Sequence, residues 1–449
     1  MRVYRGHLLH IGGAPRSDDV QAALVNVPDG ALAVDGSGTI AYSGEYRGLP
    51  EAAAAAEVID CRPGFLLPGF VDTHLHFPQT HCVDSHGGGQ LLDWLERCIF
   101  PAESMLVDDE YARGVARDFC NRRASVGTTT ALVFGSAFPH AQDALYEESI
   151  RSGLRTISGR GIQTVGPAAA GPLLTDDETA VALTRNEIER WHGRDGGLTQ
   201  VAVVPRFALS VTEATLRALG ELYDAVRADG VYFHTHLSEN LGEIDAVRAR
   251  YGVQHYLDTY DGRCAGGGVS LLGRRSVFAH AVHCSDHELS RLAETGSSIA
   301  HCPTSQLFLG SGTMPWRRTT DSGVTVALGT DVSAGDEWLI PRVLNDCFKV
   351  HISETGGQSL SIPPADLLFT ATLAGARALD IEDRIGNLDA GKEADFVIVD
   401  PGRQALLPQL LARIDPADAD RVLFTLLMNM REEALDGVYV RGRRVTGSG

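Results

Sequence analysis

The stretch from Asp72 to His76 follows an apolar run and carries two histidines separated by one residue. On a β-strand, alternate residues point to the same face, so His74 and His76 would present two imidazole rings side by side. His236 and Asp331 also lie at or just beyond the ends of apolar, strand-like runs. Three imidazoles and one carboxylate suit Zn²⁺, with Fe²⁺ as the alternative. The sequence therefore predicts His74, His76, His236 and Asp331 as ligands of a metal ion.

A metal ion of this kind lowers the pKa of bound water toward neutrality and so supplies hydroxide for hydrolysis. Asp331 is predicted to accept a proton from that water. Glu239 is predicted to transfer a proton to the substrate; the alternative is a carboxylate that caps a helix N-terminus. His280, which ends another apolar run, is predicted to orient the hydroxide, the alternative being a core histidine. Glu239, His280 and Asp331 are therefore the predicted catalytic residues, while His301 either supports the ligands or has a structural role.

The lysine content bears on the number of metal ions. Some barrel hydrolases bridge two metals with a carboxylated lysine that lies between the first histidine pair and the next histidine. This chain has two lysines, Lys349 and Lys392, and none between His76 and His236. The sequence therefore favours one metal ion per chain, unless a glutamate or a cysteine takes the bridging position.

These polar residues need a scaffold that gathers the ends of several strands. Between about residues 67 and 380, apolar runs alternate with helical stretches, which include 107–124 and 212–229. This alternation is typical of a (β/α)8 TIM-like barrel, whose active site lies at the C-terminal ends of the strands. Residues 1–66 and 381–449 contain short strands without it. We therefore expect an α/β fold, with a barrel over 67–380 and a small β-sandwich domain built from both termini.

Composition narrows the possible partners. The chain has 449 residues and a net charge of −19, which argues against nucleic-acid binding because that affinity depends on Lys and Arg. Neither a stretch of signal-peptide character nor one of membrane-spanning length is evident. The eight cysteines are scattered without a Cys-x-x-Cys pair, as expected of reduced thiols in the cytoplasm. We expect a cytoplasmic protein that acts on a neutral or cationic small molecule, without nucleic-acid or membrane partners.

Several longer motifs carry a family resemblance. They are Pro68-Gly69-Phe70-Val71-Asp72-Thr73-His74-Leu75-His76, Pro78-Gln79, Leu91-Leu92-Asp93-Trp94-Leu95-Glu96, Phe100-Pro101-Ala102-Glu103, Pro205-Arg206-Phe207, His236-Leu237-Ser238-Glu239-Asn240, His301-Cys302-Pro303 and Gly329-Thr330-Asp331. With these motifs the chain resembles the amidohydrolase superfamily and, within it, the guanine deaminase family, over nearly its whole length. The resemblance implies a metal-dependent hydrolase that converts guanine to xanthine and ammonia, with one Zn²⁺ per chain and a homodimeric assembly.

The same resemblance assigns roles to residues that would bind the substrate. Gln79 and Arg206 would form hydrogen bonds with the edge of the purine, and Phe207 would pack on its ring. Trp94 would line the pocket, the alternative being a core tryptophan. Glu239 would protonate a ring nitrogen.

Three segments depart from the family pattern: 158–172, 333–338 and 428–433. The first two are expected to border the pocket, so they bear on the substrate and leave the metal chemistry unchanged. They keep open a deaminase of a related amino-heterocycle, such as 8-oxoguanine, a pterin or another aminopurine. An amide- or ring-opening hydrolase of this fold, or a non-catalytic protein of this fold, is the further alternative.

Overall fold

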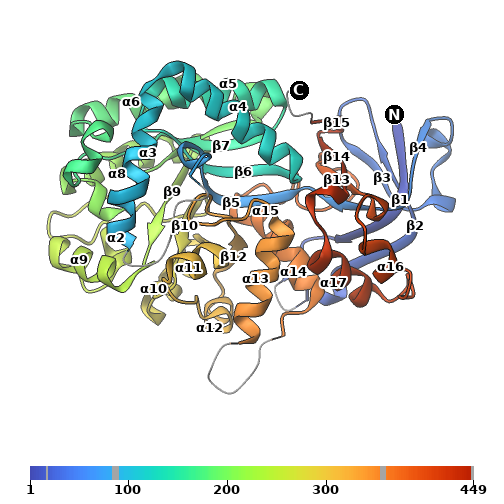
Figure 1. Cartoon of the computed structure of the whole chain (residues 1–449). Helices are drawn as coiled ribbons and strands as arrows, with labels where there is room; N and C mark the ends of the chain where they lie inside the picture. The colour runs from blue at the N-terminus through green and yellow to red at the C-terminus, as the bar shows by residue number, and fades with distance from the viewer. Residues whose placement is uncertain (17–18, 83–90, 354–360, 446–449) are drawn as a thin grey trace.

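Two sheets organise the chain. The computed structural model describes residues 1–16, 19–82, 91–353 and 361–445. An eight-stranded parallel sheet forms the barrel, and a seven-stranded sheet lies at one end of the molecule (Figure 1). The second sheet combines strands from both ends of the chain, which Figure 1 shows in blue and red beside each other. The predicted α/β barrel with a β-domain from both termini is thus confirmed, and that domain is one continuous sheet.

The barrel strands follow one another around the sheet in chain order, and every neighbouring pair is parallel. Hydrogen bonds join the last strand to the first: Thr73 Oγ1 donates to the Leu328 carbonyl at 2.7 Å, and His76 N donates to the Val332 carbonyl at 2.8 Å. This closure brings the C-terminal ends of the strands together. The strands are β5 (Phe70–His76), β6 (Thr128–Phe134), β7 (Arg155–Gly159), β8 (Thr199–Val203), β9 (Tyr232–Leu237), β10 (Ser276–His280), β11 (Ser298–His301) and β12 (Thr325–Leu328).

Helices connect the barrel strands and cover them. The predicted helices at 107–124 and 212–229 are α4 and α8, and each begins after a capping side chain: Asp108 accepts from Tyr111 N, and Thr212 accepts from Thr215 N. The longer helices are α4 (Asp109–Ser125), α5 (Pro139–Ser152), α6 (Asp177–Trp191), α8 (Glu213–Val226), α9 (Leu241–Tyr251), α10 (Asp286–Thr295), α13 (Ile340–Ile352), α14 (Pro364–Ala371) and α17 (Ala419–Asn429). The shorter ones are α1 (Glu51–Ala54), α2 (Leu91–Trp94), α3 (Phe100–Ser104), α7 (Arg194–Gly197), α11 (Pro303–Leu309), α12 (Trp316–Asp321), α15 (Leu373–Ala378) and α16 (Leu407–Leu411).

The terminal sheet pairs strands that are hundreds of residues apart in sequence. Phe396 lies opposite Pro68, which joins a C-terminal strand to an N-terminal one in antiparallel register. Tyr4, Phe396 and Tyr439 pack together on one face, the last two with parallel rings whose centroids are 4.4 Å apart. In spatial order the strands are β15 (Arg443–Arg444), β14 (Leu435–Val440), β13 (Phe396–Val399), β4 (Glu57–Pro68), β1 (Arg2–Ile11), β2 (Leu24–Val34) and β3 (Ile40–Glu45).

A buried ion network connects the barrel to the terminal sheet. Arg155, at the start of β7, is 2% exposed and donates to Glu393 at 2.5 Å and to Asp395 at 3.0 Å. Arg441, which follows β14, donates to the same oxygen of Glu393, Oε2, at 2.8 Å. Arg384 donates to Glu393 at 2.7 Å. The Glu393 carboxylate therefore accepts hydrogen bonds from three guanidinium groups at the junction of the two sheets.

Replacing Glu393 by glutamine is expected to lower the free energy of unfolding by about 2 kcal/mol, because Arg155 stays buried with one carboxylate partner fewer. Burial alone would raise the pKa of Glu393, but the hydrogen bond from Arg441 and the charge of Arg155 lower it to about 2. A depressed pKa means that this stabilisation is complete above the ordinary value of 4.5 and is lost as the pH falls toward 2.

Urea unfolding at several pH values measures this effect. Wild type and Glu393→Gln should differ at pH 7 and converge as the solution becomes acidic. Glu45→Gln is the matched control, since the ion pair of Glu45 with Arg47 is on the surface and its loss should cost less than about 1 kcal/mol. If Glu393→Gln is as stable as this control at pH 7, Glu393 does not stabilise the junction of the two sheets as assigned.

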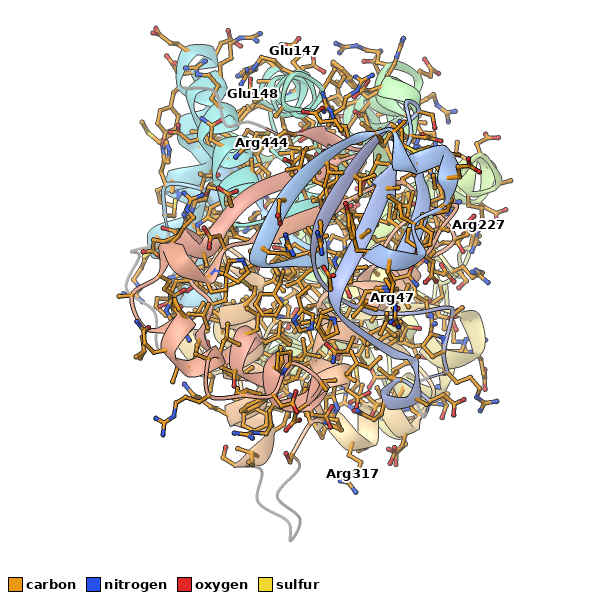
Figure 2. All side chains as sticks on the ribbon, turned by 90° about the vertical axis from the view of Figure 1, so that its right-hand side faces the viewer. Arg47, Glu147, Glu148, Arg227, Arg317 and Arg444 are labelled. Atoms are coloured by element: carbon orange, nitrogen blue, oxygen red, sulfur yellow. The ribbon has the colours of Figure 1, made fainter. Side chains whose placement is uncertain are left out.

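Charged side chains are spread over the outside of the molecule. Figure 2 looks onto the terminal sheet and shows Arg47 and Arg317 at the surface, on segments far apart in sequence. Among the described residues, no helix combines the length and the apolar character needed to cross a membrane.

Candidate active site

Four of the predicted residues meet at the C-terminal end of the barrel. His74 and His76 come from β5, His236 from β9, and Asp331 from the segment after β12, and one donor atom of each lies within 4.8 Å of the others. Asp331 Oδ1 is 3.1 Å from His74 Nε2 and 3.2 Å from His76 Nε2. The Nε2 atoms of His76 and His236 are 3.3 Å apart. This arrangement of three imidazoles and one carboxylate fits a divalent metal ion.

The surrounding backbone and side chains orient these imidazole rings. The Nδ1 atom of His236 is 2.6 Å from the Arg206 carbonyl, which leaves Nε2 to face the centre of the cluster. His74 Nδ1 is 2.8 Å from His234 Nε2, and His234 Nδ1 is in turn 2.8 Å from the Val277 carbonyl. Burial lowers the pKa of His74 to about 3 and lowers that of His236 well below its ordinary value. Both rings are therefore neutral near pH 7, which is the form that binds metals.

Asp331 is fixed by its own backbone and by a neighbouring hydroxyl. Its φ of +51° lies in the left-handed region, and its N–H donates to the His74 carbonyl at 2.8 Å. Ser305 Oγ donates to Asp331 Oδ2 at 2.6 Å. Burial alone would raise the pKa of Asp331, but the adjoining imidazoles of His74 and His76 hold it well below its usual range. Asp331 is consequently a carboxylate across the neutral pH range.

Asp72 supports this arrangement, a role that its position in the motif does not by itself reveal. Its carboxylate accepts from Thr330 Oγ1 at 2.7 Å and from Thr330 N at 3.1 Å, directly before Asp331. It also accepts from His74 N at 3.2 Å. Asp72 thereby fixes the strand that carries two candidate ligands to the segment that carries a third.

Glu239 and His280 lie next to the cluster of candidate ligands. His280 Nε2 is 3.5 Å from Glu239 Oε2 and 3.8 Å from Asp331 Oδ2. Within the described residues, neither ring nitrogen of His280 has a hydrogen-bond partner, so His280 is not a core histidine satisfied by hydrogen bonds. Ser311 Oγ donates to Glu239 Oε1 at 3.1 Å. Burial and the charge of Asp331 raise the pKa of Glu239 to about 8, which favours a protonated carboxyl at pH 7.

The helix that follows Glu239 is capped by another residue. Asn240 is the N-cap of α9, and Glu243 completes the capping box. Glu243 Oε2 accepts from the backbone N–H groups of Glu239 and Asn240 at 3.2 and 3.3 Å, and Tyr256 donates to Oε1 at 2.8 Å. The Glu239 side chain is therefore free of the capping role and points into the site.

A cavity of about 410 Å³, its open mouth included, adjoins the cluster. Gln79, Trp94, Arg206 and Phe207 line it together with Glu239, so the structure gathers all four predicted substrate contacts in one place. Trp94 is 2% exposed, and its indole N–H has no hydrogen-bond partner among the described residues. A buried donor at a cavity wall is available to a bound ligand.

A carboxylate that was not predicted as a site residue links two of these contacts. Glu103 accepts from Arg206 Nη1 at 2.6 Å and from Gln79 Nε2 at 2.7 Å, and it is 5% exposed. Gln79 Oε1 lies 3.2 Å from both the N–H and the hydroxyl of Ser333, which donate to it. The only sequence signal for Glu103 is its place in the Phe-Pro-Ala-Glu stretch. Its charge offsets that of Arg206, so the pocket suits a neutral ligand better than an anion.

Two segments that depart from the family pattern contact this pocket. Ser333 binds Gln79, and Ala334 lines the cavity. Ala170, from the 158–172 segment, packs in one apolar cluster with Trp94 and Phe207, which line the cavity. His301, by contrast, lies outside the cavity lining and has His351 as its neighbour, with 3.0 Å between their Nε2 atoms.

Comparison with known proteins agrees with this geometry. The amidohydrolase family matches residues 65–445 of this chain. A probable guanine deaminase of Deinococcus radiodurans is 42% identical over 98% of each chain, and guanine deaminase of Escherichia coli is 36% identical over 95% of this chain and 93% of its own. The solved structure of E. coli guanine deaminase matches with a TM-score of 0.90, at 34% identity and 99% coverage of both chains. With its motif histidines gathered at the ends of barrel strands, this chain belongs to the amidohydrolase family.

Proposed function

We propose that this protein is a metal-dependent guanine deaminase, which hydrolyses guanine to xanthine and ammonia. One observation supports the proposal above all: Gln79, Arg206 and Phe207 line the same cavity as Glu239 and three of the four candidate ligands, His76, His236 and Asp331. The guanine deaminases of D. radiodurans and E. coli, which match almost the whole chain, support it.

The candidate ligands are His74, His76, His236 and Asp331, and the buried Nε2 of His74 lacks a hydrogen-bond partner among the described residues, as a metal-ligating atom would. A single Zn²⁺, or Fe²⁺ as the alternative, would supply Lewis-acid activation of the attacking water when bound. Asp331 accepts a proton from that water, and His280 orients the attacking oxygen.

Glu239 completes the reaction as a proton donor. The water oxygen adds to the ring carbon that bears the amino group, and Glu239 protonates the adjacent ring nitrogen. The proton taken up by Asp331 reaches the departing amine, the carbon–nitrogen bond breaks, and ammonia leaves. The proton that remains on the added oxygen passes to Glu239 as the carbonyl of xanthine forms, which restores the protonated carboxyl. The protonated form of Glu239 that burial favours is the form that this step requires.

The purine is recognised as a neutral molecule. Arg206 and Gln79 donate to acceptor atoms at the edge of the purine, while Phe207 packs on its face. Because Glu103 offsets the charge of Arg206, the guanidinium acts as an oriented donor and favours a neutral carbonyl over a phosphate or carboxylate.

An ammonia-release assay over a substrate panel tests the proposal. Guanine, 8-oxoguanine, a pterin, adenine and a simple cyclic amide are compared with metal-loaded protein, and guanine is expected to give the highest kcat/KM. No ammonia from guanine would overturn the proposal. Faster turnover of another aminopurine or of the pterin would support the second candidate, a deaminase of a related heterocycle, which the pocket contacts of the 158–172 and 333–338 segments favour.

The predicted assembly and compartment rest on the family resemblance and on the cysteines. We propose a cytoplasmic homodimer, and the eight cysteines, all of them described and none in a disulfide bond, are consistent with a reducing compartment. Light scattering of the purified protein distinguishes a dimer from a monomer.

Replacing Glu103 by glutamine is expected to lower kcat/KM for guanine about 10- to 100-fold, mainly through a higher KM. The variant keeps the size of the side chain but removes the charge that positions Arg206 and Gln79. The metal content should not change, because Glu103 lies outside the ligand cluster.

Steady-state kinetics with metal analysis checks this expectation. Glu147→Gln, an exposed change in α5, is the matched control and should keep both kcat and KM. A positioning role for Glu103 also predicts partial recovery of KM in Glu103→Asp, which restores the charge. An unchanged KM in Glu103→Gln would show that Arg206 and Gln79 are positioned without it.

A further inference from the structure

A second group of metal-binding side chains lies apart from the candidate active site. It consists of His301, Cys347 and His351, each 0% exposed, with one donor atom of each within 4.8 Å of the others. None of the three lines the cavity next to the first cluster. The proposed deamination assigns no role to these three residues.

The fold brings these three residues together by two local arrangements. His301 is the last residue of β11, so it lies at the barrel end where the strands converge. Cys347 and His351 are four residues apart in α13, which places them one turn apart on the same face of that helix. Figure 1 shows α13 running beside α11, the short helix that directly follows His301 and Cys302. One helix thus contributes a pair of donors, and one strand end contributes the third.

The geometry is close to that of a bound transition metal. Two imidazole nitrogens in a tetrahedral zinc site lie about 3.3 Å apart, given Zn–N distances of about 2.0–2.1 Å. The Nε2 atoms of His301 and His351 are 3.0 Å apart. A thiolate at about 2.3 Å from the same ion would lie about 3.5 Å from each nitrogen, within the 4.8 Å span of the three donor atoms. Small shifts of side chains would therefore complete the coordination.

The donor set selects the class of ion. Two imidazoles and one thiol suit Zn²⁺, and equally its spectroscopic substitute Co²⁺, whereas Mg²⁺ and Ca²⁺ require oxygen ligands. Binding would release the thiol proton of Cys347 to solvent and leave a fourth position for water. The alternative is a hydrogen bond between the two imidazoles, with Cys347 as a small core residue.

Trp316 packs against this cluster and also borders a separate cavity. The ring of Trp316 lies 5.7 Å from that of His301 and 5.1 Å from that of His351, centroid to centroid. Trp316 also lines a separate open cavity of about 1060 Å³. One aromatic side chain therefore contacts both the buried cluster and a solvent-connected space.

We propose that His301, Cys347 and His351 form a second transition-metal site, occupied by Zn²⁺, that fastens α13 to the end of β11. The site is independent of the proposed deamination. Its three ligands come from two elements whose connection includes β12 and Asp331, so the bound ion would stabilise the segment that carries a candidate active-site ligand.

Co²⁺ titration of the metal-depleted full chain, followed by absorption, tests the proposal. A thiolate ligand gives Co²⁺ a sulfur-to-metal charge-transfer band in the near ultraviolet, and the His/Asp cluster contains no thiol. Wild type should bind one equivalent of Co²⁺ more than Cys347→Ser and should show the band, which Cys347→Ser should lack. His76→Ala should lose an equivalent and retain the band. Cys120→Ser, which changes a buried cysteine of α4 next to Ser149 of α5, is the matched control and should behave as wild type.

Two results would overturn the proposal: a wild-type protein that binds Co²⁺ without the charge-transfer band, or a band that persists in Cys347→Ser. If the serine variant does not fold, His351→Gln provides the same comparison, since loss of one imidazole should remove one equivalent and alter the band. The wild-type spectrum alone also decides between a metal site and a hydrogen bond between imidazoles. None of these readouts depends on turnover, so a failed ammonia assay leaves the test intact.

Discussion

Replacement of Asp331 by alanine is expected to lower kcat for guanine deamination by about 10⁴-fold or more, which is close to complete loss. Asp331 is the one carboxylate among the four candidate ligands, and in the proposed reaction it also accepts the proton of the attacking water. Both roles disappear together when its side chain is removed. The variant should also retain less metal than wild type after dialysis.

The effect should be confined to the site. Asp331 is anchored through its backbone N–H to the His74 carbonyl, and alanine keeps that hydrogen bond, so circular dichroism should remain unchanged. Asp224→Ala, an exposed change in α8, is the matched control and should keep full activity. A folded Asp331→Ala protein with more than about a tenth of the wild-type kcat would be incompatible with the assigned roles.

The sequence predicts the candidate ligands because each is marked by a local pattern. His74 and His76 follow the alternation of a strand, and His236 and Asp331 follow apolar runs, so each can be placed at a strand end without knowing the others. The barrel itself is the only long-range assumption, and it follows from the repeated alternation of strands and helices. His234 and His236 are also two residues apart, so the alternation puts both rings on one face and does not decide which of them is the ligand. The contact of His234 with His74 resolves this in the structure.

Contacts between distant residues are not marked in this way. Glu103 lies 24 residues from Gln79 and 103 residues from Arg206, and no spacing rule relates the three. Likewise, His301 and His351 meet across 50 residues of sequence. Such pairs depend on how helices pack against strand ends, and this packing is set by the whole core. The continuous terminal sheet could be predicted in part. Both ends of the chain contain strand-like segments, and unpaired strands need partners, so the two sets of strands are expected to pair with each other.

Replacement of Glu239 by glutamine is expected to lower kcat about 10²- to 10⁴-fold while KM changes little. Glutamine matches the shape of the carboxyl group and can still accept the hydrogen bond from Ser311, but it has no acidic proton to give to the ring nitrogen. Because Glu239 lies outside the ligand cluster, the metal content should stay at the wild-type level. This separates the variant from Asp331→Ala, in which activity and metal fall together.

Steady-state kinetics, metal analysis and thermal unfolding on the same samples check this expectation. Thermal stability should be equal to that of wild type or higher, since an amide replaces a buried carboxyl whose ionisation burial opposes. Glu221→Gln, an exposed change in α8, is the matched control and should leave all three measurements unaltered. If Glu239→Gln keeps kcat within about threefold of wild type, proton transfer in this site must come from another group. Loss of metal together with activity would instead make Glu239 part of the ligand set.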